Sequence, residues 1–351
     1  MSAPDTDLFF GMDGTDGTDA PGTDDTGARR RPEDGGGNVP MSVTVRVPAK
    51  VNVQLAVGGL RPDGFHDLAN VFLAVGLYDE ITVTPTAPTE GPRVTCSGPD
   101  THHVPLDRSN LALRAVDALA LRHGISPDVH VHIDKDIPVA GGMAGGSADA
   151  AGALLACDTL WGTRTPREEL LDICAELGSD VPFSLVGGAA LGRGRGEVLT
   201  PLEVGGTFHW VFAVADGGLS TPAVYRECDR LRERRGTGSG VDDVPAPEAS
   251  PVLLAALRSG DARLLAANLS NDLQPAAVSL LPSLDETLAV GREAGALAAL
   301  VSGSGPTCAF LAEDPASASD IAVALRDADV CRDARTATSP APGATVLRAA
   351  V

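Results

Sequence analysis

The chain contains few aromatic residues and almost no lysine. Phe, Trp and Tyr together make up 3% of its 351 residues, so we expect Ala, Val and Leu to build the hydrophobic core. Lys50 and Lys135 are the only lysines in the sequence. A coding bias toward arginine would explain the loss of the others at surface positions. Arginine cannot replace a lysine whose compact ammonium fits a small site, so both positions are candidates for function.

The sequence also lacks a basic charge balance, long apolar segments and paired cysteine motifs. With 47 Asp and Glu against 27 Lys and Arg, the formal net charge is −20, which argues against nucleic acid or an anionic membrane as a partner. No run of about 18 apolar residues predicts a membrane span, and the N-terminus lacks the pattern of a signal peptide, so we expect a cytoplasmic protein. The six cysteines show no CxxC spacing and predict free thiols rather than a zinc site or disulfide framework.

Residues 1–40 differ in composition from the rest of the chain. They are rich in Gly, Asp and Thr and contain nine acidic residues against three arginines. Such a segment has little with which to form a core, so we expect a disordered acidic tail. Met41 opens a well-patterned segment and is a candidate for the start of translation.

From residue 43 onward, strand patterns alternate with helix patterns. Alternating apolar positions predict strands, among them 43–57 with a break at Pro48, 81–85, 129–133 and 210–215. Helical periodicity predicts helices, among them 110–121, 166–177, 251–268 and 283–296. This alternation predicts an α+β fold of two layers. We expect an N-terminal domain over residues 41–203 and a C-terminal domain over residues 204–351.

The segment PVAGGMAGGSADAA, residues 138–151, is the strongest functional signal. It follows the strand predicted at 129–133, and Ser147 is a candidate N-cap for the alanine-rich helix after it. Four glycines permit positive φ angles and a close approach of a ligand to the backbone: Gly141, Gly142, Gly145 and Gly146. The free N–H groups and the dipole of a helix start favour a phosphate. The segment matches neither the P-loop nor the dinucleotide fingerprint, and a tight turn without a ligand is the alternative.

Two further motifs stand in order around this glycine segment: VPAKVNV at residues 47–53 and VSGSGPTCAF at residues 301–310. With these three motifs the chain resembles the GHMP family of small-molecule kinases, named for galactokinase, homoserine kinase, mevalonate kinase and phosphomevalonate kinase. The resemblance implies a two-domain fold with the active site in the cleft between the domains. It also implies phosphoryl transfer from ATP to an alcohol, with Mg²⁺ as the metal cofactor.

Three other segments favour one substrate within the family. They are RPDGFHDL at residues 61–68, LGSDVPF at 177–183 and STPAVY at 220–225. These segments are similar to those of members that phosphorylate the 2-hydroxyl of a cytidine diphosphate derivative of methylerythritol, in the non-mevalonate route to isoprenoids. A family member acting on homoserine, mevalonate or a sugar is an alternative, as is a catalytically silent nucleotide-binding protein of this fold. For the oligomeric state, the sequence is compatible with a monomer and with a homodimer.

The resemblance implies roles for particular residues. Lys50 and Asp180 would flank the acceptor hydroxyl, with Asp180 as the base and Lys50 as the cation that keeps it ionised. Asn110 and Lys135 would lie near the adenine, and Ser147 is a candidate Mg²⁺ ligand. The ATP phosphates would lie on the glycine segment: Pro138, Val139, Ala140, Gly141, Gly142, Met143, Ala144, Gly145, Gly146 and Ser147.

The substrate site implied by the resemblance has an aromatic end. Phe65 and Tyr225 would sandwich the cytosine ring and His66 would form a hydrogen bond to it, although the family usually has tyrosine at position 65. The full set is Asn52, Phe65, His66, Asp180, Thr221, Tyr225, Gly303, Ser304 and Gly305. Structural alternatives exist: a turn or cap for Asp180, a solvated surface position for Lys50, a turn histidine for His66 and core packing for Phe65.

Overall fold

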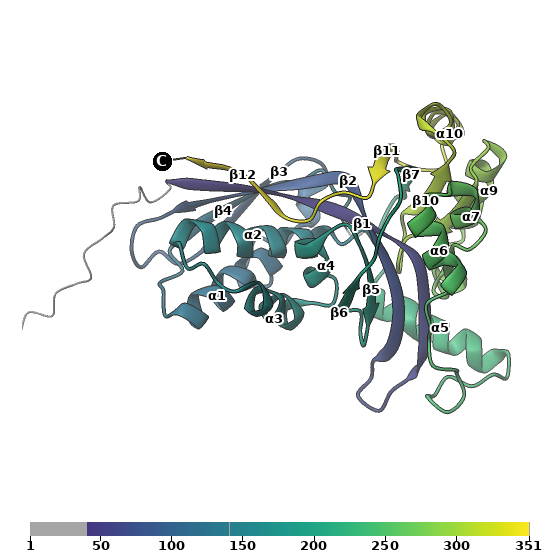
Figure 1. Ribbon diagram of the computed structural model, residues 1–351, viewed down its shortest axis with the longest axis horizontal. Helices are drawn as coiled ribbons and strands as arrows, with labels where there is room; N and C mark the ends of the chain where they lie inside the picture. Colours follow the sequence, from purple (N-terminus) through teal and green to yellow (C-terminus); the bar gives the residue numbers. More distant parts are fainter. Residues whose placement is uncertain (1–40, 140, 351) are drawn as a thin grey trace, which may run out of the picture. The chain divides into compact units, whose positions relative to one another are not determined.

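The larger of two sheets is built on two long antiparallel strands, β1 (Ser42–Leu60) and β2 (His66–Pro85). The computed structural model describes residues 41–139 and 141–350, so the predicted tail at 1–40 lies outside the described residues. The strand order is β12, β1, β2, β4, β3, while β5 pairs with β2 and β6, and β8 pairs with β1 (Figure 1). The other strands are β3 (Arg93–Ser97), β4 (Val129–Asp134), β5 (Ala189–Arg193), β6 (Val198–Pro201), β8 (Ser270–Asn271) and β12 (Thr345–Ala350).

One strand replaces the two that were predicted on either side of Pro48. β1 runs through this proline, and its register against β2 shifts between Pro48 and Ala49. A register shift of this kind accommodates a residue that has no N–H for the ladder. The prediction of a break was therefore wrong, while the strand character of both halves is confirmed.

Helices α1 to α4 cover one face of this sheet (Figure 1). They are α1 (Leu111–His123), α2 (Gly145–Trp161), α3 (Arg167–Leu177) and α4 (Val181–Val186), with a short 3-10 turn at Thr101–His103 before them. α2 approaches β1 and β2 closely because it carries Gly152. A Cβ there would lie 2.6 Å from Cδ1 of Ile81 and 2.9 Å from Cγ2 of Val47. The predicted helices at 110–121 and 166–177 and the predicted strand at 129–133 are confirmed.

The start of α2 differs from the prediction. The helix begins at Gly145, two residues before the predicted N-cap Ser147, and Ala144 occupies the cap position with φ 62°. No side chain caps this end. The backbone of Ala144 adopts the left-handed conformation, and the helix starts at the next residue. The first free N–H groups of the helix are therefore those of Gly145 and Gly146.

The second sheet has the order β11, β7, β10, β9. Its strands are β7 (Phe208–Val214), β9 (Ala298–Val301), β10 (Cys308–Ala312) and β11 (Asp333–Ser339). The helices of this part are α5 (Thr221–Arg234), α6 (Pro251–Ser259), α7 (Ala262–Ala266), α8 (Gln274–Leu280), α9 (Ser283–Glu293) and α10 (Pro315–Asp327). The single helix predicted at 251–268 is two helices, because Gly260 ends α6 with φ 71° and Asp261 caps α7.

The chain passes from the first sheet to the second between β6 and β7, which is where the predicted boundary at residue 203 falls. The later strands β8 and β12 return to the first sheet, where each pairs with β1. The division into residues 41–203 and 204–351 stays a prediction. None of the helices in the described ranges is long and apolar enough to cross a membrane.

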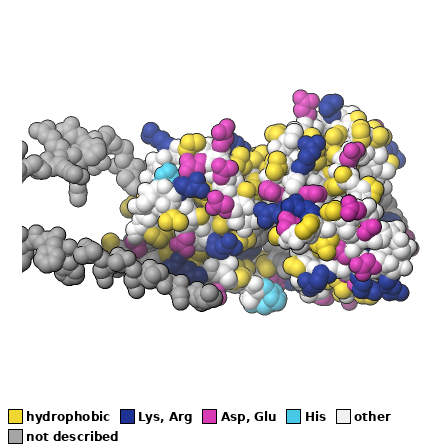
Figure 2. All heavy atoms as spheres, turned by 90° about the horizontal axis from the view of Figure 1, so that it is seen from below, with side chains coloured by type: hydrophobic (Ala, Val, Ile, Leu, Met, Phe, Trp, Pro, Cys, Tyr) yellow, Lys and Arg dark blue, Asp and Glu magenta, His cyan; other side chains and the backbone are white. Residues whose placement is uncertain are grey.

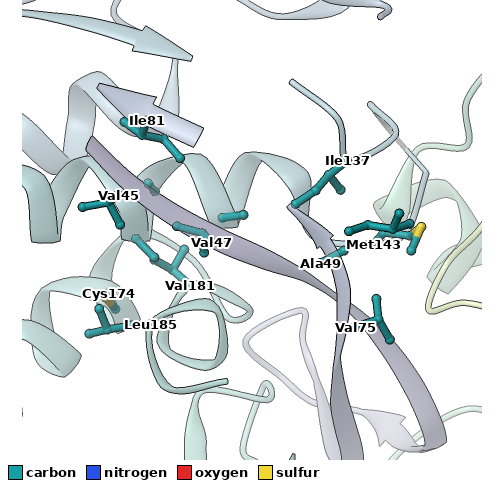
Figure 3. Close-up of a cluster of buried hydrophobic side chains, with 14 of the residues drawn as sticks. Val45, Val47, Ala49, Val75, Ile81, Ile137, Met143, Cys174, Val181 and Leu185 are labelled. Atoms are coloured by element: carbon teal, nitrogen blue, oxygen red, sulfur yellow. The ribbon is translucent and has the colours of Figure 1, made fainter. Parts of the chain in front are cut away.

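The core consists mainly of Ala, Val and Leu, as the scarcity of aromatic residues predicts, although its largest fully buried side chains include Trp210 and Phe72. Figure 3 shows side chains of β1, β2, α3, α4 and the segment before α2 meeting in one buried cluster. Its labelled members are Val45, Val47, Ala49, Val75, Ile81, Ile137, Met143, Cys174, Val181 and Leu185. At the surface, the face in Figure 2 carries acidic and basic side chains interspersed among apolar ones. The described atoms of this face therefore form no broad basic area.

Candidate active site

A cavity of about 830 Å³ brings together residues from segments far apart in the chain. Its walls come from β1, the start of β2, the glycine segment, the start of α2, the residues before α4, and α5. Sixteen of the predicted site residues line it: Lys50, Asn52, Phe65, His66, Gly141, Gly142, Ala144, Gly145, Gly146, Ser147, Asp180, Thr221, Tyr225, Gly303, Ser304 and Gly305. Pro138, Val139, Met143, Asn110 and Lys135 do not line it, and Ala140 lies outside the described residues.

The carbonyl groups of the glycine segment are tied down, while the N–H groups at the start of α2 are left for a ligand. Gly142 O accepts hydrogen bonds from Nζ of Lys50 at 2.7 Å and from Oγ of Ser302 at 3.2 Å. Gly141 O accepts one from the Thr307 N–H at 3.2 Å. The uncapped N-terminus of a 17-residue helix faces the cavity through Gly145. This arrangement suits a phosphate group.

The second glycine of the segment, Gly142, has little room for a side chain. Its φ is 74°, a conformation that L-residues rarely adopt. A Cβ at Gly142 would lie 2.3 Å from the carbonyl oxygen of Ser302. Glycine at this position lets residues 302–306, the SGSGP loop, close against the glycine segment.

Lys50 and Asp180 form a partly buried ion pair at the side of the cavity. Nζ of Lys50 lies 3.6 Å from Oδ2 of Asp180, and the two side chains are 6% and 31% exposed. Burial lowers the pKa of the Lys50 ammonium, whereas the Asp180 carboxylate acts in the opposite direction. The Asp180 side chain makes no capping hydrogen bond at the start of α4. The cap alternative for Asp180 and the surface alternative for Lys50 therefore do not hold.

A chain of polar side chains leads away from Lys50. Its Nζ donates to Oδ1 of Asn52 at 2.6 Å, and Nδ2 of Asn52 donates to Oδ1 of Asn70 at 2.7 Å. All three side chains are buried, and all three line the cavity. Sequence reasoning missed Asn70. An asparagine within the apolar run of β2 was the available signal, because a buried amide needs partners.

The other end of the cavity is aromatic. The His66 and Tyr225 rings lie with centroids 5.1 Å apart, and the Arg195 guanidinium lies 5.2 Å from the centre of the Phe65 ring. Phe65 is 48% exposed, so the core alternative for this residue is wrong. Asp229 contacts His66, and both Asp229 and Arg195 line the cavity. No motif in the sequence singles out Arg195 or Asp229.

Thr221, Ser304 and Tyr225 are the remaining polar members of the predicted substrate set. Oγ1 of Thr221, at the start of α5, lies 2.9 Å from Oγ of Ser304 in the SGSGP loop. Burial raises the pKa of the Tyr225 hydroxyl. The hydroxyl pair links the two walls of the cavity, and Tyr225 stays a neutral ring there.

The structure gives Lys135 a place apart from the cavity. Its Nζ forms a buried ion pair with Asp79 and lies 2.9 Å and 3.1 Å from the two carboxylate oxygens of Asp149. Oδ1 of Asp79 accepts the N–H groups of residues 136 and 137 at 2.7 Å and 2.9 Å. A Cβ at Gly145 would lie 3.2 Å from Nζ of Lys135. The ammonium thus joins β2 to α2 beneath the glycine segment, where its compact shape fits.

Asn110 is likewise used within the fold. Its Oδ1 accepts the Ala112 N–H at 2.8 Å and so caps α1, while its Nδ2 donates to the Pro105 carbonyl at 2.7 Å. Its neighbour Leu111 lines the cavity instead. Adenine contacts through the side chains of Asn110 and Lys135 are therefore not supported by these positions.

The fold and the site define a small-molecule kinase, and the chain belongs to the GHMP kinase family. Its residues 110–188 match the model of the GHMP kinases N terminal domain, and residues 253–330 match that of the GHMP kinases C terminal domain. It is 74% identical over 307 residues to the 4-diphosphocytidyl-2-C-methyl-D-erythritol kinase of Streptomyces avermitilis, covering 88% of this chain and all of that protein. Identity to the protein of the same name from Thermobifida fusca is 58% over 315 residues, covering 88% of this chain and all of the relative.

Solved structures agree in fold. A crystal structure of 4-(cytidine 5'-diphospho)-2C-methyl-D-erythritol kinase has a TM-score of 0.67 and 32% identity, and the match covers 85% of this chain and 99% of that one. A mevalonate kinase from L. major has a TM-score of 0.64 at 14% identity, and the match covers 86% of this chain and 96% of that one. This second likeness concerns the fold alone. The predicted family, the α+β fold and the identification as a kinase are confirmed.

Proposed function

We propose that this kinase transfers the γ-phosphoryl group of ATP to the 2-hydroxyl of 4-diphosphocytidyl-2-C-methyl-D-erythritol. The high identity to the Streptomyces and Thermobifida relatives over their full length supports this substrate. One structural observation carries the mechanism: the Lys50–Asp180 pair lies in one cavity with the glycine segment and the aromatic end. The product would be the 2-phosphate, an intermediate of isoprenoid precursor synthesis.

Phosphoryl transfer requires a cradle for the phosphates, compensation of their charge and an oriented hydroxyl. The free N–H groups at the start of α2 supply the cradle. The Asp180 carboxylate accepts the proton of the attacking hydroxyl, and the Lys50 ammonium holds the resulting oxygen in line. Because Gly142 O and Asn52 fix the ammonium from two sides, it is oriented before the substrate arrives.

Mg²⁺ fits this site with few protein ligands. The described residues contain no cluster of three His, Cys, Asp or Glu side chains that would hold a metal by themselves. The Ser147 hydroxyl lines the cavity at the start of α2 and is a hard oxygen donor, as Mg²⁺ prefers. Bound there with phosphate and water ligands, Mg²⁺ would neutralise charge on the phosphates.

A cytoplasmic location and a monomeric or dimeric state stay predictions from the sequence.

The test is ADP release by the purified protein with ATP and Mg²⁺. We expect turnover with 4-diphosphocytidyl-2-C-methyl-D-erythritol and none above background with homoserine, mevalonate or galactose. The Asp180→Asn variant, purified in the same way, controls for contaminating ATPases. Turnover with another alcohol would support the kinase activity but contradict the proposed substrate. A lack of turnover with all four compounds would contradict the whole proposal.

A further inference from the structure

His66 is held by a carboxylate from another element of the cavity wall. Its Nε2 lies 3.0 Å from Oδ1 and 3.2 Å from Oδ2 of Asp229. His66 begins β2 and Asp229 lies on α5, and in Figure 1 α5 runs beside the lower end of the hairpin that β1 and β2 form. The two side chains are 5% and 13% exposed. Water therefore competes little for this contact.

The chemistry of the contact determines which ring nitrogen carries the proton. An ionised carboxylate only accepts hydrogen bonds, so Nε2 of His66 must be the protonated nitrogen that donates to Asp229. In the neutral ring, Nδ1 then keeps its lone pair. The described residues supply no hydrogen-bond partner for Nδ1, and His66 lines the cavity. A ligand in the cavity therefore meets an acceptor at Nδ1.

An acceptor at this place distinguishes between pyrimidine bases. The rings of Tyr225 and Phe65 offer the stacking surface that a planar base uses. Cytosine presents an exocyclic amino group, a donor, where uracil presents a carbonyl oxygen, an acceptor. Nδ1 of His66 would accept a hydrogen bond from the amino group of cytosine. Opposite the carbonyl oxygen of uracil it would form no hydrogen bond, because both atoms are acceptors. A site built for one donor rejects the analogue that lacks it, because its own polar group is left unpaired.

We propose that Asp229 is a positioning residue that sets the base specificity of this kinase by fixing His66 in the Nε2-protonated tautomer. The inference rests on the proposed function, which puts a cytidine diphosphate compound in this cavity. Asp229 acts on the base only through His66. Its replacement is therefore expected to change the choice between bases rather than the chemistry at the acceptor hydroxyl.

The decisive variant is Asp229→Asn. An asparagine has the same shape and can hydrogen-bond Nε2 with either its oxygen or its nitrogen, so the contact survives while the tautomer is no longer imposed. The kcat/KM values are measured at pH 8.5 with the cytidine compound and with its uridine diphosphate analogue. The matched control is Asp67→Asn, which changes the exposed acidic neighbour of His66 that pairs with Arg61.

We expect the wild-type protein to prefer the cytidine compound by at least about 100-fold. In Asp229→Asn this preference should fall at least about tenfold, with the KM for ATP and the melting temperature within error of the wild type. Asp67→Asn should keep the wild-type preference. An unchanged preference in Asp229→Asn, or equal losses with both bases, would overturn the proposal.

A spectroscopic measurement tests the tautomer without any substrate. Nitrogen-15 NMR of the histidine rings, with His66 assigned from the spectrum of His66→Gln, distinguishes a protonated from an unprotonated Nδ1. We expect Nε2 protonation in the wild type and a mixture in Asp229→Asn, and a wild-type ring protonated at Nδ1 would refute the inference. If the wild-type protein does not turn over the cytidine compound, the proposed function fails, and this spectrum still decides the tautomer.

Discussion

The buried charges beneath the glycine segment predict an unusual pH dependence of stability. Lys135 lies between the carboxyl groups of Asp79 and Asp149, and all three side chains are buried. Burial, with a contribution from the Asp79 charge, raises the pKa of Asp149 from 3.8 to about 8, although Lys135 acts in the opposite direction. Near neutral pH, Asp149 thus keeps its proton in the folded protein and loses it in the unfolded chain.

The sign and size of the effect follow from proton linkage. Because the folded state holds the proton more tightly, this group stabilises the fold fully below pH 3.8 and loses that contribution as the pH rises to about 8. Between these values its contribution falls by about 1.4 kcal/mol for each pH unit. Asp149→Asn imitates the protonated side chain at every pH. Relative to the wild type, the variant should therefore gain about 3 kcal/mol of unfolding free energy between pH 5 and pH 7.

The assay is urea unfolding of both proteins at pH 5, 6, 7, 8 and 9, since the difference between them cancels the titrating groups that do not interact with Asp149. The difference should rise through pH 7 and level off above about pH 8. Asp320→Asn, the same change at an exposed position of α10, is the control and should give a constant difference. A constant difference for Asp149→Asn as well would refute the reasoning. It would mean that Asp149 is ionised in the folded protein and that Lys135 balances two carboxylates.

Two further substitutions test the site and the segment that forms it. Asp180→Asn should lower kcat at least about 100-fold, because the carboxylate beside Lys50 is the proposed proton acceptor. The dissociation constant for ATP should change less than about threefold, and near-normal turnover would remove Asp180 from the mechanism. Gly142→Ala should lower the unfolding free energy by about 1 to 3 kcal/mol, because the φ of 74° strains alanine and its Cβ would lie 2.3 Å from Ser302 O. Gly146→Ala, whose Cβ would approach only a Leu111 methyl at 3.7 Å, should keep the wild-type unfolding free energy; equal stability of the two variants would contradict the argument.

Much of the fold could be predicted from local patterns. The strand at β4 and the helices α1, α3 and α9 appear close to their predicted bounds, because their apolar spacing matches one structural period. The errors arose where neighbouring elements decided the outcome. β1 continues through Pro48 because its partner β2 absorbs the irregularity by a register shift.

The candidate site was predictable as a set of motifs but less so as a set of contacts. Lys50 and Asp180 are 130 positions apart by their numbers, yet their side chains lie 3.6 Å apart. Family resemblance brought them together in prediction, and the structure confirms that they are neighbours. Asn70, Arg195 and Asp229 were missed because none belongs to a motif, and each reaches the cavity only through the folding of its strand, hairpin or helix.

The sequence by itself determined the family, the glycine segment and the residue types needed for phosphoryl transfer, because motifs and their order are properties of the chain. Only the tertiary structure decided how each charged or polar group is used. The two lysines illustrate the difference. Lys50 lies at the cavity beside a carboxylate, whereas Lys135 is enclosed by the acidic side chains of Asp79 and Asp149 beneath the glycine segment. The burial and the charged neighbours that separate these roles are supplied by distant segments, and no local pattern contains them.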